Sequence, residues 1–368
     1  MSDTTRHVQS RPLAIVTSDA LKRFAAEVFA SAGMPDQHAG IVADVLVWAN
    51  LRGVDSHGVA RIPRYVDMIH AGDLNPKPAI SVRTETVASV VIDADRAAGP
   101  VAMSAAMSAA VDKAKSAAVG LALVCQTTHT AALGFYTLAA TREGMAAIAL
   151  AASGPNMAYH GARAAGVSTS PISIAVPGGE RGPIVLDMAT GIVSVGKLLQ
   201  AKRTGQAIPP GSALDRDGNP TTDPDAAQIP LPMAGPKGSG LALLIECITS
   251  PIVSSPILAD ALEGAQESRR HRQNGLALAI DVARFGDPRA FRREIDRLVK
   301  AVKALPLDAN TGEVLLPGER GDRVFAERSR AGIPIPRTTF DELGALAERL
   351  GVRMVDTTPA AGAATPPR

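Results

Sequence analysis

The chain has 368 residues, of which 46% are hydrophobic and 20% charged, so it is long enough for a large core and too apolar to be disordered throughout. Lysine plus arginine exceeds aspartate plus glutamate by 38 − 36 = +2, a surplus too small to hold a nucleic-acid backbone. We therefore expect a globular protein that does not bind nucleic acid.

The N-terminal residues, the apolar runs and the cysteines indicate the cellular location. Residues 1–12 mix charge and polarity without an apolar run, so we expect a disordered start and no secretion signal. The longest apolar runs are far shorter than the roughly 20 residues that cross a bilayer, so no membrane partner is expected. Cys125 and Cys247 lie in apolar runs and form no disulfide framework, which favours the cytoplasm.

Helical patterns open the chain. Potential capping residues at 17–19 precede apolar residues at helical spacing, and Gly33 is placed to end that helix. Asp36 begins a second apolar stripe that runs up to Gly53. The pattern returns to helices after Pro317, where one apolar face ends at Gly351.

Short β-branched and apolar runs fill the centre of the chain. Residues 87–92 and 121–125 predict strands, with an Ala/Met-rich helix over 100–119 between them. Further apolar runs predict strands buried on both faces: 146–152, 172–176, 184–186 and 276–280. Proline and glycine concentrate over 171–240, which predicts a loop-rich middle.

These patterns predict the fold class α/β (α+β). A sheet-containing domain over 81–316 is expected to bind cofactor and substrate, and a helical domain is expected from both chain ends, 13–80 and 317–355. The Ala/Thr/Pro-rich residues 356–368 predict a disordered tail.

The densest polar cluster is Arg52-Gly-Val-Asp-Ser-His-Gly-Val-Ala-Arg61, at the end of the second helix. His57 can exchange a proton near neutral pH, and the guanidinium of Arg61 suits a carboxylate. Together they predict a site for a small acid. The alternative is that His57 only caps a helix and that Arg61 and Arg64 are solvated.

A second histidine, His129, follows the predicted strand 121–125 and should lie at its carboxyl end, where active sites of α/β sheets often form. The alternative is a buried histidine that bonds the hydroxyls of neighbouring threonines. The motif by itself leaves both interpretations open.

Two glycine-rich segments and one acidic segment resemble motifs that bind phosphate or calcium. Gly191–Lys197 imitates a phosphate-binding loop, but Leu198 stands where a hydroxyl should hold magnesium, so we reject a nucleotide triphosphatase. Gly235-Pro-Lys-Gly-Ser-Gly240 either binds phosphate at a helix start or forms an ordinary turn. The acidic run at 215–219 breaks the calcium-loop pattern, and we predict no metal.

Read jointly, the motifs resemble the type-2 malate/L-lactate dehydrogenase family, which includes ureidoglycolate, sulfolactate and diketogulonate enzymes. The resemblance covers nearly the whole chain and keeps its motifs in order. They are Asp55-Ser-His-Gly-Val-Ala-Arg61 with Pro63 and Tyr65; His129 with Gly134-Phe-Tyr136; Leu186-Asp-Met-Ala-Thr190 with Gly196-Lys197; Gly218-Asn-Pro-Thr-Thr-Asp223; Gly235-Pro-Lys-Gly238 with Gly240-Leu-Ala-Leu243; and Leu316-Pro-Gly-Glu-Arg320 with Gly332-Ile333.

The resemblance implies a homodimeric enzyme with a non-Rossmann fold that binds NAD or NADP and interconverts a small 2-hydroxy acid and its 2-oxo acid. By matching positions, His57 and His129 are the candidate proton donors, and His57 is favoured. Arg61 is implied to bind the substrate carboxylate, with Ser56 beside it. The implied cofactor contacts are Ser153, Asp187, Met188, Ala189, Lys237, Gly238, Gly318, Glu319 and Arg320.

Departures from the family pattern concern the expected pocket. His129-Thr-Ala131 replaces His-Phe-Gly, Thr169 and Ser170 precede Pro171 where the family often has an asparagine, and Leu276-Ala-Leu278 replaces His-Phe-Phe. The substrate is therefore open beyond malate and lactate. The alternatives are a reductase of cyclic imino acids, whose relatives tend to carry Ala-His at Gly235-Pro236, and a non-catalytic carboxylate-binding homologue.

Overall fold

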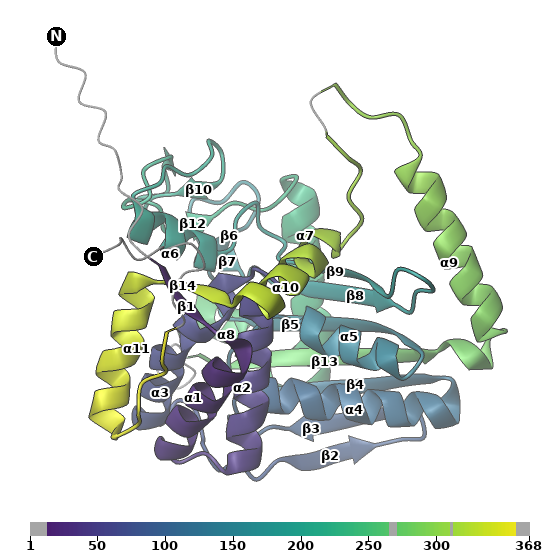
Figure 1. Cartoon of the computed structure of the whole chain (residues 1–368), viewed down its shortest axis with the longest axis horizontal. Helices are drawn as coiled ribbons and strands as arrows, with labels where there is room; N and C mark the ends of the chain where they lie inside the picture. The colour runs from purple at the N-terminus through teal and green to yellow at the C-terminus, as the bar shows by residue number, and fades with distance from the viewer. Residues whose placement is uncertain (1–12, 265–270, 310–311, 358–368) are drawn as a thin grey trace, which may run out of the picture.

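The computed structural model describes residues 13–264, 271–309 and 312–357 (Figure 1). The predicted disordered start and most of the predicted tail lie outside these ranges. Within them, no helix combines the length and the apolar character that crossing a bilayer requires.

A seven-stranded mixed sheet forms the centre of the molecule, in the order β2-β3-β4-β13-β5-β8-β9. Only β3 and β4 run parallel, and the other neighbours are antiparallel. The fold is therefore mixed α/β and is not doubly wound, as expected. The strands span Ser81–Glu85 (β2), Ser89–Asp93 (β3), Val119–Thr127 (β4), Met145–Ser153 (β5), Ile172–Val176 (β8), Ile184–Met188 (β9) and Gln273–Asp281 (β13).

The two sides of the sheet pack against different helices. On β4, Ala122 and Val124 join the core under α4 (Gly99–Ala117) and α5 (Gly134–Arg142). Leu123 and Cys125 point the other way, against Ile245 of α7 (Pro236–Thr249). Figure 1 shows α4 and α5 on the near face of the sheet and α7 beyond it. The central strands are thus buried on both faces because each face carries a helix.

The outer strands depart from this prediction. On β8, burial alternates, and Ile174 is 37% exposed. On β9, Asp187 faces a cavity that solvent enters. Expecting both faces to be buried was wrong for these strands, because α5 covers one face of β8 and Ile174 lies on the other.

Elements from both chain ends form a helical layer beside the sheet. The predicted helices are confirmed as α1 (Ser18–Ser31), α2 (Asp36–Leu51) and α11 (Arg337–Leu350), and α3 (Ile62–His70) and α10 (Glu319–Ala331) join them. The side chain of Thr17 caps α1 by accepting from the backbone N–H of Ala20 at 3.3 Å. The exact domain boundaries stay a prediction.

Two short strands that the patterns did not predict tie these ends together. β1 (Leu13–Val16) pairs antiparallel with β14 (Ile333–Pro336), so Ala14 lies opposite Ile335. Each strand has four residues, and β14 contains two prolines. Proline disfavours strand interiors, so only the pairing partner reveals these elements.

The middle of the chain folds over one end of the sheet. It contains short strands, namely β6 (Met157–Ala158), β7 (Ala165–Val167), β10 (Ala213–Leu214), β11 (Pro220–Thr221) and β12 (Ile229–Pro230). It also contains α6 (Val195–Thr204), η3 (Pro251–Val253) and α8 (Leu258–Leu262). After β13, the turn η4 (Val282–Arg284) leads into α9 (Pro288–Lys303), which stands out from the body (Figure 1).

Candidate active site

A cavity of about 790 Å³ lies where the helical layer meets the carboxyl ends of β4, β5 and β9. Its volume is in the range of small-molecule sites, roughly 300–1,000 Å³. Most of the predicted site residues line it, although they come from five separate segments of the chain. These are Ser56, His57, Arg61, His129, Ser153, Asp187, Met188, Ala189, Gly318 and Arg320.

Two hydrogen bonds of the Asn50 side chain hold the loop that carries His57. Asn50 donates from Nδ2 to Asp55 Oδ1 at 2.6 Å and accepts at Oδ1 from the N–H of Val59 at 2.8 Å. A Cβ on Gly58 would lie 2.1 Å from that same Oδ1, so only glycine fits there. Arg328 of α10 donates to both carboxylate oxygens of Asp55, at 2.6 and 3.1 Å.

This network folds the loop into two turns of 3₁₀-helix, η1 (Asp55–His57) and η2 (Val59–Arg61), before α3. His57 caps no helix, so the alternative interpretation of that residue is wrong. Arg61 is partly buried in the cavity wall, where its Nε donates to the carbonyl oxygen of Ser56 at 2.6 Å. Sequence reasoning missed Asn50 and Arg328, since neither lies in the motif they support.

The two candidate histidines stack on each other. Their ring centroids are 5.5 Å apart and their planes differ by 24°. His57 Nδ1 lies 3.0 Å from the hydroxyl of Ser56. Burial, and then the charge of Arg61, lower the pKa of His57 to about 4. His57 is therefore neutral at pH 7.

His129 bonds to a tyrosine and not to the neighbouring threonines. Thr127 and Thr128 donate to the carbonyl oxygen of Ala97, at 3.2 and 3.0 Å. The hydroxyl of Tyr65, on α3, donates to the carbonyl oxygen of His129 at 2.9 Å and lies 2.7 Å from His129 Nδ1. Burial, followed by the charge of Arg61, lowers the pKa of His129 well below its usual value.

The phenol contact defines the protonation pattern of His129. Tyr65 has one hydroxyl proton, and the bond to the carbonyl oxygen uses it. We assign the hydrogen that bridges to the phenol oxygen to Nδ1 of His129, because this satisfies both contacts of Tyr65, and Nε2 is then the nitrogen able to accept a proton. Tyr65 belonged to the family motif, but only the structure shows its partner.

Asp187 lies on β9, one residue before its end, lines the cavity and accepts from the N–H of Gly134 at 2.8 Å. Solvent reaches it through the cavity, but protein atoms surround it elsewhere, and this desolvation raises the pKa of Asp187 to about 6. A Cβ on Gly134 would lie 3.0 Å from its Oδ2, so the strand end and α5 pack closely.

Gly318 and Arg320 also line the cavity. Arg52 donates to the carbonyl oxygen of Gly318 at 2.9 Å and pairs with Asp322, which anchors the start of α10. Gly318 has φ +87°, and a Cβ there would lie 2.7 Å from Val185 Cγ1. Glycine is required here both by conformation and by the close approach of the strand.

Three predicted cofactor residues do not line this cavity. Lys237 is exposed on the first turn of α7. Gly238 is buried, and a Cβ there would meet the carbonyl oxygen of Met233 at 2.4 Å. Glu319 pairs with Lys303 at 2.7 Å and accepts from the N–H of Leu316 at 3.1 Å. A role for these three in cofactor binding stays a prediction.

Within the described ranges no group of three or more histidine, cysteine or acidic side chains is placed to hold a metal ion. The cavity lining offers two stacked imidazoles, a guanidinium and the carboxyl group of Asp187.

This fold and this site define an oxidoreductase that acts on the CH–OH group of hydroxy acids. The chain belongs to the malate/L-lactate dehydrogenase family, whose family model matches residues 16–344. It is 35% identical over 337 residues to the L-sulfolactate dehydrogenase of Methanocaldococcus jannaschii, covering 91% of this chain and 97% of that protein.

Solved structures agree with this family. Malate dehydrogenase from Pyrococcus horikoshii is similar with a TM-score of 0.84 and 31% identity, over 93% of this chain and 97% of that one. Delta1-piperideine-2-carboxylate reductase from Pseudomonas syringae pv. tomato is similar with a TM-score of 0.80 and 28% identity, over 90% and 99%. Membership implies a nicotinamide cofactor.

Proposed function

We propose that the protein interconverts a small 2-hydroxy acid and its 2-oxo acid with NAD or NADP. The observation that carries this proposal is the pair of stacked, neutral histidines, 5.5 Å apart, in one cavity with Arg61. Two imidazoles beside a guanidinium suit proton exchange on a substrate that also bears a carboxylate.

The cavity residues fit a nicotinamide cofactor. Besides the histidines, the cavity lining offers the hydroxyl of Ser153, the carboxyl group of Asp187 and the glycine at Gly318, where a side chain would not fit. We propose that these residues, with Met188, Ala189 and Arg320, hold the cofactor. When bound, it exchanges a hydride with the substrate carbon.

Arg61 is proposed to bind the substrate carboxylate. Its Nε bond to the Ser56 carbonyl oxygen orients the guanidinium plane, and Gly196 of α6 closes over it, since a Cβ there would lie 3.2 Å from Nη2. A guanidinium held in this way presents a planar donor edge to a carboxylate. Because the carboxylate is bound in both ground and transition states, Arg61 should act mainly on KM.

His129 is proposed to exchange the proton of the substrate hydroxyl. This differs from the preference for His57 drawn from sequence. Tyr65 fixes the hydrogen on Nδ1 of His129 and leaves Nε2 as acceptor, whereas the rotatable hydroxyl of Ser56 imposes no such order on His57. His57, stacked on His129, then supplies the second imidazole of the pair.

The test is a spectrophotometric panel in which NADH and NADPH oxidation is followed with 2-oxo acids and with cyclic imines. We expect turnover of one or more 2-oxo acids, a loss of about 10²–10⁴-fold in kcat for His129→Ala, and a raised KM for Arg61→Ala. Wild-type turnover by both His57→Ala and His129→Ala on the preferred substrate would overturn the assignment.

A cyclic imino acid reductase is the second candidate, favoured by the similarity to the piperideine-2-carboxylate reductase fold. Its substrate carboxylate would bind Arg61 in the same way, and the hydride would go to a C=N carbon. Gly235-Pro236 in place of Ala-His argues for the hydroxy-acid branch. Exclusive turnover of imines in the panel would decide for the reductase. Family membership gives no support to the non-catalytic alternative.

The proposed assembly is a homodimer. Large apolar side chains are exposed on α7, where Leu244 is 61% and Ile248 43% exposed, and on α9, where Leu298 is 56% exposed. Exposed apolar side chains on these two helices suit protein contacts, and the family resemblance makes a second copy the expected partner. Both cysteines, buried Cys125 and exposed Cys247, are free thiols, which supports the proposed cytoplasmic location.

A further inference from the structure

Arg64 lines the same cavity as Arg61 and has no part in the reaction proposed so far. It follows Arg61 by three positions, and Arg61 has helical backbone angles where η2 runs into α3. Residues three apart on a helix share one face, with roughly 5–6 Å between their Cβ atoms. Arg61 is partly buried and Arg64 is exposed, so Arg64 lies nearer the mouth of the cavity.

Two contacts hold Arg64 beside His129. The residue after it, Tyr65, has its hydroxyl 2.7 Å from His129 Nδ1. Nη2 of Arg64 lies 3.0 Å from His271 Nδ1 and donates to it, because a guanidinium has no acceptor atom. Asp73 lies 3.7 Å from Nε2, the other ring nitrogen of His271. In the described part of the chain Arg64 itself has no carboxylate partner.

Gln273 lines the cavity near the same histidine, and its amide group has a defined orientation. Thr130, next to His129, donates to Gln273 Oε1 from its N–H at 3.2 Å and from its hydroxyl at 3.3 Å. A backbone N–H only donates, so the amide oxygen must face Thr130 and Nε2 must face away. Nε2 has no hydrogen-bond partner among the described residues, which leaves two N–H donors for a ligand.

These contacts close into a ring around one part of the cavity wall. Three hydrogen-bonded contacts and three short stretches of chain make up the ring. Its members, in order, are Arg64, Tyr65, His129, Thr130, Gln273 and His271. All of them line the cavity except Tyr65, which is fully buried. The ring therefore brings the guanidinium of Arg64 and the free amide donors of Gln273 to the same side of the cavity as His129.

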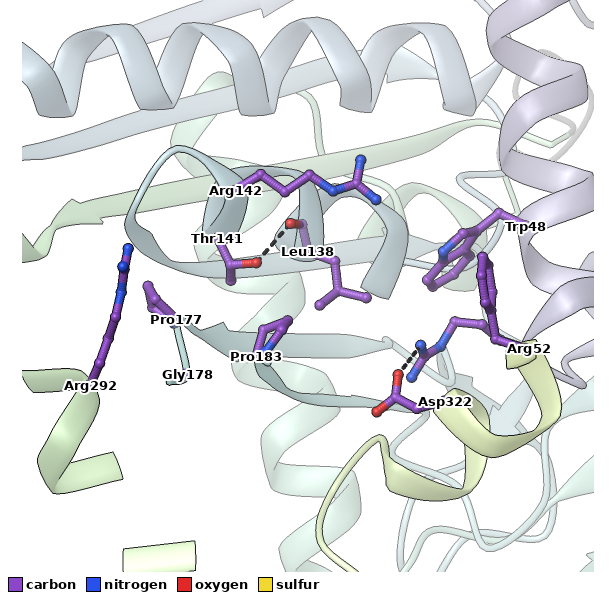
Figure 2. A pocket seen from close by; sticks show the side chains of 11 residues that line it. Trp48, Arg52, Leu138, Thr141, Arg142, Pro177, Gly178, Pro183, Arg292 and Asp322 are labelled. Carbon is purple, nitrogen blue, oxygen red and sulfur yellow. Dashed lines mark hydrogen bonds and ion pairs between the residues drawn. The ribbon is translucent and has the colours of Figure 1, made fainter. Parts of the chain in front are cut away.

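The other arginines described in this cavity are engaged elsewhere. Figure 2, a view of a neighbouring cavity of about 410 Å³ that Arg52 also lines, shows Arg52 bonded to Asp322. Arg272 is buried and donates to the carbonyl oxygen of Pro256. Arg320 is among the proposed cofactor contacts. Of the described arginines, the two at the start of α3 remain for the substrate.

The charge of Arg64 also reaches the group that exchanges the proton. Burial is the largest cause of the lowered pKa of His129, and the charge of Arg64 is among the smaller ones. An anion bound to Arg64 would offset that charge. It would thereby favour the protonated His129 that the reduction of a carbonyl group requires.

We propose that Arg64 and Gln273 bind a second acidic group of the substrate, carried on C3, and so determine specificity. Arg61 binds the carboxylate next to the reacting carbon, and Arg64 binds the acid at the other end. The protein then prefers a 2-oxo acid with a carboxylate or a sulfonate on C3 to one with a neutral side chain. This inference rests on the proposed function, since it names the substrate class of the same site.

The test compares 2-oxo acids that differ in charge but hardly in shape. Oxaloacetate and its neutral 4-amide, 2-oxosuccinamate, form one such pair, and 3-sulfopyruvate carries a sulfonate instead. At saturating cofactor, kcat/KM for oxaloacetate or 3-sulfopyruvate should exceed that for 2-oxosuccinamate by about 10–100-fold, the value of a hydrogen bond between charged groups. The better of the two acids identifies the acidic group as carboxylate or sulfonate.

Two variants test the residues through the ratio of kcat/KM for the acid to that for the amide. Arg64→Gln should bring this ratio close to unity. Gln273→Glu keeps an acceptor toward Thr130 but replaces the donor side with an anion, so it should lower the ratio as well. Arg349→Gln is the matched control, because Arg349 is exposed, pairs with Asp67 of α3 at 3.5 Å and lies outside the cavity lining.

A wild-type ratio close to unity would overturn this inference and leave the dehydrogenase proposal standing. So would a ratio that either variant leaves unchanged, including equal losses on both substrates, since a residue that only holds the His129 loop would affect them alike. Failure of the wild type to reduce any 2-oxo acid would overturn the proposed function as well.

Discussion

The chemistry of the site depends on the protonation state of its two histidines. His57 and His129 stack in a crowded cavity, and the Arg61 guanidinium beside them further opposes protonation, so both imidazoles are neutral in the ligand-free protein. A neutral imidazole is the form that accepts a proton from an alcohol. A substrate carboxylate on Arg61 would cancel the repelling charge and make the protonated form accessible for the reverse reaction.

The first prediction concerns Tyr65. Tyr65→Phe should lower kcat by about tenfold with little change in KM, because His129 loses the contact that fixes its tautomer. Nitrogen-15 NMR of the imidazoles should show His129 changing from one tautomer to a mixture. If Tyr65→Phe kept the wild-type kcat and His129 stayed protonated only on Nδ1, the positioning role of Tyr65 would be wrong.

Tyr136→Phe is the matched control for this variant. Tyr136 is as buried as Tyr65, and its hydroxyl donates to the carbonyl oxygen of Thr130 at 2.7 Å without touching a histidine. Both variants lose a buried hydrogen bond, worth about 0.5–1.5 kcal/mol of stability. Only Tyr65→Phe should alter the NMR signals of His129.

The second prediction uses pH. The pKa of His57 is lowered from 6.5 to about 4, so its contribution to stability is present above pH 6.5 and is lost as pH falls toward 4. The pKa of Asp187 is raised from 3.8 to about 6, so its contribution is present below pH 3.8 and is lost as pH rises through 6. His57 and Asp187 therefore have opposite effects on how the unfolding free energy changes with pH over the same range.

Urea unfolding between pH 4.5 and 6 at fixed protein concentration would separate them. Relative to wild type, His57→Gln should make the unfolding free energy rise less with pH, and Asp187→Asn should make it rise more. Changes of the same sign in both variants would show that one of these pKa shifts has the wrong direction.

At the scale of elements, the loop between α2 and α3 depends on a helix from the other end of the chain. Arg328 of α10 clamps Asp55, and Asn50 of α2 bonds both Asp55 and Val59. His57 and Arg61 are therefore positioned by α2 and α10 together. His129 is positioned by β4 and by Tyr65 of α3.

The third prediction tests this loop. Gly58→Ala places a Cβ 2.1 Å from Asn50 Oδ1, so the loop must shift, at a cost of about 1–3 kcal/mol, and kcat/KM should fall more than tenfold. Gly40→Ala is the control, because Gly40 lies inside α2 with open space around its Cβ position and should gain about 0.5–1 kcal/mol. Thermal unfolding and kcat/KM of both variants check the prediction; unchanged kcat/KM in Gly58→Ala would show that the loop tolerates the shift.

At the scale of the whole molecule, apolar side chains on α7 and α9 are exposed in the part of the chain that the structure describes. Burying these side chains against a second copy would also hold α9, which stands out from the body, in place.

The fourth prediction is that light scattering after gel filtration gives twice the 37.9 kDa chain mass. Leu244→Asp and Leu298→Asp should shift the protein toward the monomer, because each places a charge in the proposed interface. Val87→Asp, at an isolated position that is 76% exposed, should leave the mass unchanged. A monomeric wild type would exclude the homodimer.

Local pattern alone determined much of this protein. Apolar spacing and caps identified α1, α2 and α11, and short apolar runs identified β3, β4, β5, β8, β9 and β13, because hydrophobic periodicity is a property of neighbouring residues. The motif around His57 and the position of His129 after a strand also identified the cavity that the structure shows.

Tertiary structure alone decided the rest. The insertion of β13 between β4 and β5, the pairing of β1 with β14, and the contacts of Tyr65 with His129 and of Arg328 with Asp55 all join residues far apart in the chain. Such contacts leave no mark on local periodicity. For the same reason Lys237 and Glu319, which matched cofactor positions by motif, lie outside the cavity once the helices that carry them are placed.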